Sequence, residues 1–184
     1  MVFILGIEME YQRVTEVLYP FSGLKYIDPT ILENAAARGT KVHKICEAIV
    51  EGLEGWDVPE ELAGYVQSFK SWWTEGHEVK AVEKRLFCED LAITGQIDLI
   101  TEEPGGIHII DLKTSANEAK SWMLQGSAYS YLAKKAGFDV RGILFIRLLR
   151  DGKYPKLHFY EENMQLFKEC LNVYRYFWGT KAKR

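Results

Sequence analysis

The stretch from Gly95 to Lys113, GQIDLITEEPGGIHIIDLK, places the strongest constraint on how this chain can fold. It contains two apolar runs that read as β-strands, and the EEPGG segment between them has the composition of a turn. Asp98 lies within the first run, and Asp111 and Lys113 lie within the second. Burying an unpaired charge is costly in free energy, so we expect these charges to be paired with one another or with a metal ion.

The composition is that of a folded globular protein without a strongly basic surface. The 184 residues are 47% hydrophobic and 13% aromatic, which predicts a single well-packed domain spanning residues 1–184. The formal net charge is −3 at pH 7. A nucleic-acid partner would therefore have to be held by local basic patches, because no global positive field attracts it.

Cysteine usage and hydropathy indicate a soluble, cytoplasmic protein. Cys46, Cys88 and Cys170 are scattered and form no CxxC pair, as is typical of reduced thiols in a cytosolic protein. The opening MVFILGI lacks the basic region and the cleavage site of a signal peptide. No apolar run approaches the roughly 20 residues that a membrane span requires, so we expect no membrane association.

Periodicity and capping residues predict an α/β architecture. Asp28 and Pro29 are suited to cap and begin a helix, and Ser115 or Asn117 is expected to cap a later one. From Glu78 the period changes from 3.6 to two, which marks an antiparallel meander of three strands. We expect irregular structure with one short helix or strand over 1–27, helices over 29–53, 59–76, 117–135 and 161–178, and strands over 78–90, 91–101, 107–113, 140–149 and 156–160. This order predicts a central mixed β-sheet flanked by helices.

Alternation along a strand brings the charged side chains of the second apolar run to one face. Asp111 and Lys113 point to one side, whereas Ile110 and Leu112 point to the other. If the meander pairs as expected, Asp98 on the neighbouring strand approaches Asp111 on that same face. Two carboxylates this close repel each other unless a cation lies between them, and Mg²⁺ suits that position because it prefers oxygen ligands.

Two neighbouring groups extend this predicted metal site. The main-chain carbonyl of Leu112 lies between the two charged residues in sequence and could supply a further ligand. Lys113 could orient an attacking water or help to deprotonate it. The alternative for the same spacing is a structural ion pair at the surface, formed by Asp98 or Asp111 with Lys113.

Four motifs in order resemble the PD-(D/E)XK nuclease superfamily, and specifically its RecB-like exonuclease branch. The chain carries Gly95-x-x-Asp98, then Asp111-x-Lys113, then Gln125-x-x-x-Tyr129, and upstream of them ARGTKVHKICE is similar to the branch's G-x-x-x-H signature. Ile97 stands where other superfamily members carry proline, a residue that the RecB-like branch commonly lacks. The resemblance covers residues 10–150 and implies a restriction-endonuclease-like core.

The resemblance also implies metal-binding and catalytic roles. Asp98 and Asp111 would be the metal carboxylates, His43 would be a further metal ligand, and Lys113 would position the nucleophilic water. Glu83, on the strand before the first motif, is a candidate additional acid. The alternatives are a helix histidine without a special role at position 43 and a solvent-facing glutamate at position 83.

Gln125 and Tyr129 are four residues apart on one predicted helix and therefore share a face. The resemblance implies that this face lines the site and contacts the DNA or the catalytic lysine. Trp122 and Leu132 fall on nearly the same stripe, so the alternative is ordinary helix packing.

Basic and hydroxyl side chains near these motifs form a candidate phosphate track. Ser115 and backbone N–H groups at the start of the following helix are suited to bind a phosphate. Charge runs are also common on solvated faces, which is the alternative. The candidate DNA-binding residues are Arg38, Lys41, Lys44, Ser115 and Lys120.

The function that the resemblance implies is that of an Mg²⁺-dependent deoxyribonuclease, with Mn²⁺ able to substitute. We expect an exonuclease that hydrolyses phosphodiester bonds in DNA recombination, repair or processing, in a bacterial or phage-infected cell. No iron–sulfur cluster is expected, because only three cysteines are present and their spacing is wrong. The alternatives are a non-catalytic DNA-binding or structural subunit and a structure-specific endonuclease. The sequence leaves open a homo-oligomer or a recombination-protein partner.

Overall fold

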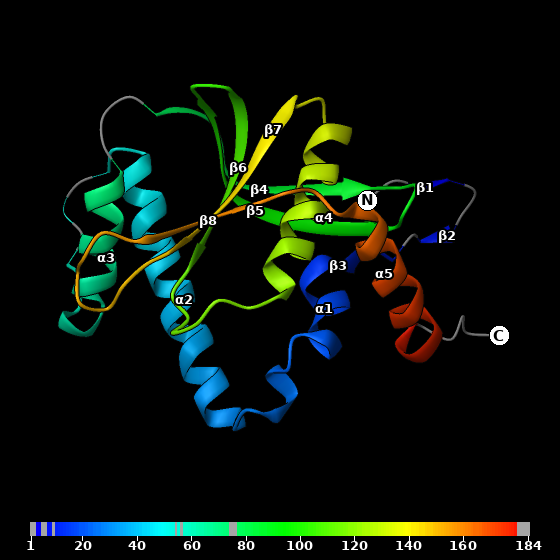
Figure 1. The fold of residues 1–184 in the computed structure, drawn as a ribbon, viewed down its shortest axis with the longest axis horizontal. Helices are drawn as coiled ribbons and strands as arrows, with labels where there is room; N and C mark the ends of the chain where they lie inside the picture. Colours follow the sequence, from blue (N-terminus) through cyan, green and yellow to red (C-terminus); the bar gives the residue numbers. More distant parts are fainter. Residues whose placement is uncertain are drawn as a thin grey trace.

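A mixed β-sheet between two layers of helices forms the body of the molecule (Figure 1). The structure is a computed structural model that describes residues 3–4, 7–8, 10–53, 55, 57–73 and 77–179. The end of the second expected helix, residues 74–76, and the basic tail, residues 180–184, lie outside the described residues. The sheet and its flanking helices confirm the predicted architecture.

Six strands form the central sheet, in the order β3, β5, β6, β7, β8, with β4 paired to β5. Strands β4, β5 and β6 form the expected antiparallel meander, whereas β6 and β7 are parallel and are joined by a helical crossover. The apolar strand β7 lies inside the sheet, between β6 and β8. The strand bounds are β3 Gln12–Arg13, β4 Glu78–Cys88, β5 Ile93–Glu103, β6 Gly106–Lys113, β7 Val140–Arg147 and β8 Lys156–Tyr160; a separate pair consists of β1 Phe3–Ile4 and β2 Ile7–Glu8.

Along one edge of β5, the middle of the strand has no partner strand among those described, and this is where the sheet opens. Strand β4 pairs with β5 along nearly its whole length, so β3 and β6 share the other side of β5. There β3 pairs with Ile93 and Thr94, and the pairing with β6 begins only at Leu99. Among the described strands, none pairs with residues 95–98 on that side, which leaves Asp98 at the point where β5 and β6 part.

Helices cover both faces of the sheet, and each face has its own apolar core. Helices α1 (Val14–Leu18), α4 (Ser121–Lys135) and α5 (Met164–Trp178) cover one face, whereas α2 (Pro29–Val50) and α3 (Glu60–Trp72) cover the other. Ile109 packs in the first core and Ile110 in the second, as alternation along β6 requires. Among the described helices, none has both the length and the apolar character that a membrane span needs.

The segment before α2 contains the short helix α1, as the expectation for 1–27 allowed, and more regular structure than expected after it. After α1 come two 3₁₀ turns, η1 (Tyr19–Phe21) and η2 (Leu24–Tyr26). Helix α2 then begins as predicted, with the Asp28 carboxylate accepting hydrogen bonds from the backbone N–H groups of Thr30 and Ile31. The segment from α1 to α2 spans the lower end of the molecule in Figure 1.

The predicted start of α4 is wrong. The helix begins at Ser121, and neither Ser115 nor Asn117 caps it. The Ser115 hydroxyl instead donates to the Asn117 carbonyl, and the Arg147 guanidinium donates to the carbonyl of Ala116. These bonds hold the chain between β6 and α4 as a loop, so Ser115 does not present a phosphate site at a helix N-terminus.

Helix α4 packs against β7 more closely than a side chain at position 126 would allow. A Cβ added to Gly126 would lie 2.4 Å from Ile143 Cγ2. A Cβ added to Gly39 in α2 would meet only Thr114 Oγ1, at 3.6 Å. Both glycines lie inside α-helices, so they differ in how closely neighbouring atoms pack against them and not in backbone conformation.

Replacing Gly126 with alanine should destabilise the protein relative to the same change at Gly39. Both positions are inside helices, so alanine gains about 1 kcal/mol of helix propensity at each. Overpacking at Gly126 should cost about 1–3 kcal/mol, and we expect the free energy of unfolding of G126A in urea to fall below that of G39A by this amount. Equal values for the two variants would contradict the close approach of α4 to β7.

Candidate active site

Asp98 occupies the opening between β5 and β6 and has two partners there. Its Oδ2 accepts a hydrogen bond of 2.7 Å from the backbone N–H of Leu112. Nδ1 of His43, from α2, lies 3.4 Å from the same oxygen. The carboxylate is therefore held across the gap between two strands, on the side of the sheet that α2 covers.

His43 and Asp98 shift each other's pKa towards the charged pair. Burial by itself would lower the pKa of His43, but the Asp98 carboxylate raises it to about 9. Burial would likewise raise the pKa of Asp98, but the charge of His43 holds it below its usual value. At neutral pH the metal-free pair is thus imidazolium and carboxylate.

Glu83 joins this pair because the backbone of β4 is distorted at that residue. Its φ of +45° lies in the left-handed region that residues other than glycine rarely adopt. One ligand atom from each of His43, Glu83 and Asp98 lies within 4.8 Å of the other two. Burial and the nearby Asp98 charge both raise the pKa of Glu83. The residue predicted as an additional acid therefore lies beside the two predicted metal ligands.

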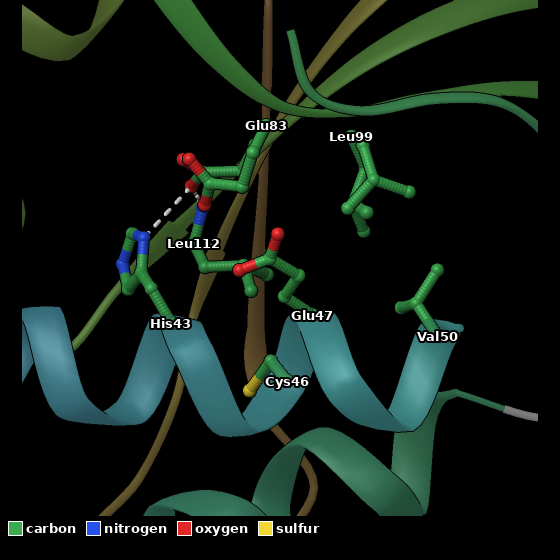
Figure 2. Close-up of a pocket in the computed structure, with 9 residues that line it drawn as sticks. His43, Cys46, Glu47, Val50, Glu83, Leu99 and Leu112 are labelled. Carbon is green, nitrogen blue, oxygen red and sulfur yellow. Dashed lines mark hydrogen bonds and ion pairs between the residues drawn. The ribbon is translucent and has the colours of Figure 1, made fainter. Parts of the chain in front are cut away.

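A small cavity between α2 and the sheet is lined by these three side chains (Figure 2). Its volume, about 10 Å³ measured at the centre of a water-sized sphere, holds about one water molecule or ion. Glu47 also lines it, and Figure 2 shows His43 and Glu47 rising together from α2. Glu47 was not among the predicted site residues, although its position one helical turn after His43 is a signal that could have found it.

Asp111 lies on the opposite side of the sheet and faces α4. It is 4% exposed, and its Oδ1 accepts a hydrogen bond of 2.9 Å from Gln125 Nε2. Lys113 Nζ lies 2.6 Å from Oδ2, which has no other polar partner among the described residues. Burial raises the pKa of Asp111 to about 6; Lys113 opposes this shift and Asp98 adds to it. Asp111 and Lys113 share a face of β6, as predicted.

Gln125 connects the catalytic candidates to the body of α4. Its Oε1 accepts from Lys113 Nζ at 3.2 Å, and its Nε2 also donates to Tyr129 Oη at 3.1 Å. The Tyr129 ring packs on Gly95, where an added Cβ would lie 2.6 Å from Tyr129 Cε1. Gln125 thus makes polar contacts within the site. Tyr129 is 5% exposed and holds the Gln125 side chain through its hydroxyl.

The expected approach of Asp98 and Asp111 on one face is only partly correct. The Asp98 charge raises the pKa of Asp111, so the two carboxylates are electrostatically close. Their partners nevertheless lie on opposite sides of the sheet, because β5 and β6 stop pairing at Leu99 and Ile110 and then part.

The donor set fits a divalent metal ion. Asp98 and Asp111 are buried carboxylates that repel each other, and within the described part of the chain Asp111 Oδ2 is held by the lysine alone. The ion-sized cavity itself is lined by His43, Glu83 and Asp98 and not by Asp111, and carboxylate oxygens with an imidazole suit Mg²⁺ or Mn²⁺. Leu112, whose carbonyl is a predicted ligand, lines the same cavity.

Of the predicted DNA-binding residues, Arg38 and Ser115 line a cleft that Lys113 also lines, and Arg38 lines a second hollow with Lys41. Arg38 is half-buried in α2; its Nε has no hydrogen-bond partner among the described residues, and its guanidinium lies 5.7 Å from the Tyr65 ring. The other four are exposed: Lys41 and Lys44 on α2, and Ser115 and Lys120 before α4.

The fold and the site define a nuclease of the restriction-endonuclease-like class, in which parting strands of a mixed sheet present two acids and a lysine. The family model of the PD-(D/E)XK nuclease superfamily matches residues 57–174. The chain belongs to this superfamily, whose nucleases use divalent metal ions. The matched range contains Asp98, Asp111 and Lys113, whereas His43 precedes it.

The chain is also similar to a mouse protein, mitochondrial genome maintenance exonuclease 1 from Mus musculus. The two are 28% identical over 142 residues, which cover 71% of this chain and 42% of the mouse protein. The chain thus spans less than half of the length of the relative that it matches.

Metal binding should release a proton from His43. The ring is protonated at pH 7.5 because its pKa is about 9, and a histidine must be neutral to ligate a metal. Titration calorimetry with Mn²⁺, in buffers of different ionisation heat, should show about one proton released per ion at pH 7.5 and fewer as the pH rises through 9. His43→Asn is the control and should release none. Identical heats in all buffers for the unaltered protein would exclude His43 as a ligand.

Proposed function

We propose that residues 1–184 act as one nuclease domain that hydrolyses phosphodiester bonds in DNA with the help of Mg²⁺, or of Mn²⁺ in its place. The observation that carries this proposal is the placement of Asp98, Asp111 and Lys113 at the opening of the sheet, with both acids buried. A buried acidic pair of this kind is costly for stability alone, and its cost is offset when it holds a cation.

Asp98, Asp111, His43 and the Leu112 carbonyl would hold the metal, with Glu83 as an additional acid. When bound, such an ion makes a water more acidic and stabilises the charge that develops on the scissile phosphate. The protein supplies a rigid frame for these ligands, since Asp98 is anchored by a backbone N–H and Asp111 by a side-chain amide.

Lys113 orients the attacking water and offsets the negative charge of the phosphate. Its ammonium is held at two points, by Asp111 and by Gln125, so its direction is fixed before substrate binds. Gln125 is a positioning residue, because it acts through Asp111 and Lys113. Tyr129 in turn holds Gln125, and the packing of its ring on Gly95 fixes the distance between α4 and β5.

We further propose an exonuclease of the RecB-like branch that acts in DNA recombination, repair or processing, in the cytoplasm of a bacterial or phage-infected cell. The four motifs in order support the branch, and the name of the mouse relative, an exonuclease, supports the mode of cleavage. The DNA backbone would be bound by the five residues named above as DNA-binding candidates. A homo-oligomer or a recombination protein is a further candidate partner.

Gln125→Leu should lower kcat far more than Tyr129→Phe does. Leucine removes both the donor to Asp111 and the acceptor for Lys113, so we expect a loss of about 10²-fold in kcat with little change in KM. Phenylalanine removes only the hydroxyl that Gln125 donates to and keeps the ring on Gly95, so its loss should stay under about tenfold. Steady-state cleavage of a labelled oligonucleotide measures both variants. A larger loss for Tyr129→Phe would contradict the positioning role of Gln125.

The nuclease assignment itself is tested with end-labelled linear and closed circular DNA, single- and double-stranded. We expect Mg²⁺ to support stepwise degradation from ends, EDTA to abolish it, and Asp111→Ala to reduce it by about 10³-fold or more. Asp151→Ala, which removes an exposed carboxylate paired with Lys153, is the matched control and should keep full activity.

Three results would contradict parts of this assignment. Degradation that survives EDTA or Asp111→Ala would exclude the metal mechanism. Cutting of closed circles would indicate an endonuclease. Binding without hydrolysis under every metal tried would indicate a non-catalytic subunit.

A further inference from the structure

A cleft of about 620 Å³ adjoins the catalytic network on the side of Lys113 and Gln125, both of which line it. It is distinct from the ion-sized cavity beside His43, which none of its lining residues shares. One wall comes from α1, the 3₁₀ turns that follow it and the first half of α2, and the other comes from the loop that joins β6 to α4 and from the start of α4. The cleft therefore leads from the reacting centre outward between two segments far apart in sequence.

The first wall, which we call the apolar wall, consists of Tyr19, Leu24, Ile27 and Ile31. These side chains are 45%, 38%, 41% and 61% exposed, in that order. Large apolar side chains gathered at one place beside a polar catalytic network favour a ligand that covers apolar surface.

The second wall is fixed in place before any ligand binds. The Arg147 guanidinium donates to the carbonyl of Ala116 within the loop. At the next turn of this loop, Glu118 accepts a hydrogen bond from the Tyr160 hydroxyl and lies 3.1 Å from His158 Nδ1. Both anchors come from strands β7 and β8, so the loop is tied to the sheet and the cleft is built into the fold.

The cleft combines apolar side chains with two basic ones, and this combination suits unpaired nucleotides. Arg38 also lines it, and with Lys113 it offers positive charge to phosphates. A duplex presents mainly its charged backbone to a protein, and apolar side chains gain nothing from contact with phosphates. The faces of unpaired bases are apolar; they stack on an aromatic ring such as that of Tyr19 in a sequence-tolerant way, and aliphatic side chains beside the ring cover the rest of their apolar surface.

We propose that this cleft binds the unpaired bases of a single DNA strand next to the scissile phosphate, so that the substrate is a single-stranded end. The inference rests on the proposed nuclease function and specifies its substrate. The bases contact the apolar wall, while the phosphates follow Arg38 to Lys113. A blunt duplex must first unpair its end to reach the site, and it is therefore a poor substrate.

Binding is measured without cleavage by fluorescence anisotropy in EDTA. A short oligothymidine should bind at least about tenfold more tightly than a strand of the same length with abasic sites, which keeps the phosphates and removes the bases. Leu24→Ser and Ile31→Ser should each weaken oligothymidine binding by about tenfold and leave binding of the abasic strand unchanged. Ile31 is largely exposed, so its variant tests the wall at little cost to folding, which circular dichroism verifies.

Tyr26→Ser is the matched control, because Tyr26 lies on the same 3₁₀ turn as Leu24, is 81% exposed and does not line the cleft. Its binding should equal that of the unaltered protein. Equal affinity for the thymidine and abasic strands, or equal losses in Tyr26→Ser and Leu24→Ser, would overturn the inference.

Cleavage in Mg²⁺ separates this inference from the nuclease assignment. We expect single strands and duplexes with single-stranded tails to be degraded at least about tenfold faster than blunt duplexes. Equal degradation of blunt duplexes would overturn the single-strand inference and leave the nuclease assignment intact. Base-dependent binding without any cleavage would overturn the nuclease assignment and keep the cleft as a single-strand site.

Discussion

The burial of two carboxylates, Asp98 and Asp111, at one opening of the sheet is the constraint on which the rest of the structure depends. Neither can be ionised there without a partner, and their mutual repulsion adds to the cost of desolvation. The fold supplies His43 and a backbone N–H to the first, and Lys113 to the second. His43 comes from α2 on one face of the sheet, and Gln125, which donates to Asp111, comes from α4 on the other face. Both helical layers are therefore needed to build the site.

The packing of α4 converts this electrostatic requirement into a fixed geometry. The absence of a side chain at Gly95 lets the Tyr129 ring approach β5, and the absence of one at Gly126 lets the helix approach β7. Gln125 lies between these contacts, so its amide reaches Asp111 without freedom to turn away. Close packing at the two glycines therefore sets the position of Gln125, and through it the direction of the Lys113 side chain.

Period-two patterning was enough to predict the meander and the shared face of Asp111 and Lys113, whereas the contact of Gln125 with the site was implied by the resemblance to the nuclease superfamily. Features that depend on local distortion or on distant segments were not predictable in this way. Glu83 was a candidate because of its place on the preceding strand, but the positive φ at this residue does not follow from its neighbours in sequence. The start of α4 is displaced because Arg147, on the next strand, ties down the preceding loop. One wall of the cleft comes from short helical turns before α2, whose place in the fold only the tertiary structure establishes.

Anomalous diffraction from crystals soaked in Mn²⁺ tests the central claim most directly, because it locates the ion without reference to activity. The account predicts an anomalous peak between the carboxylates of Asp98 and Asp111, with His43 turned to ligate the ion and Lys113 released from Asp111 towards solvent or phosphate. A soaked crystal in which the His43–Asp98 and Lys113–Asp111 pairs persist, with no ion between the two acids, would contradict it.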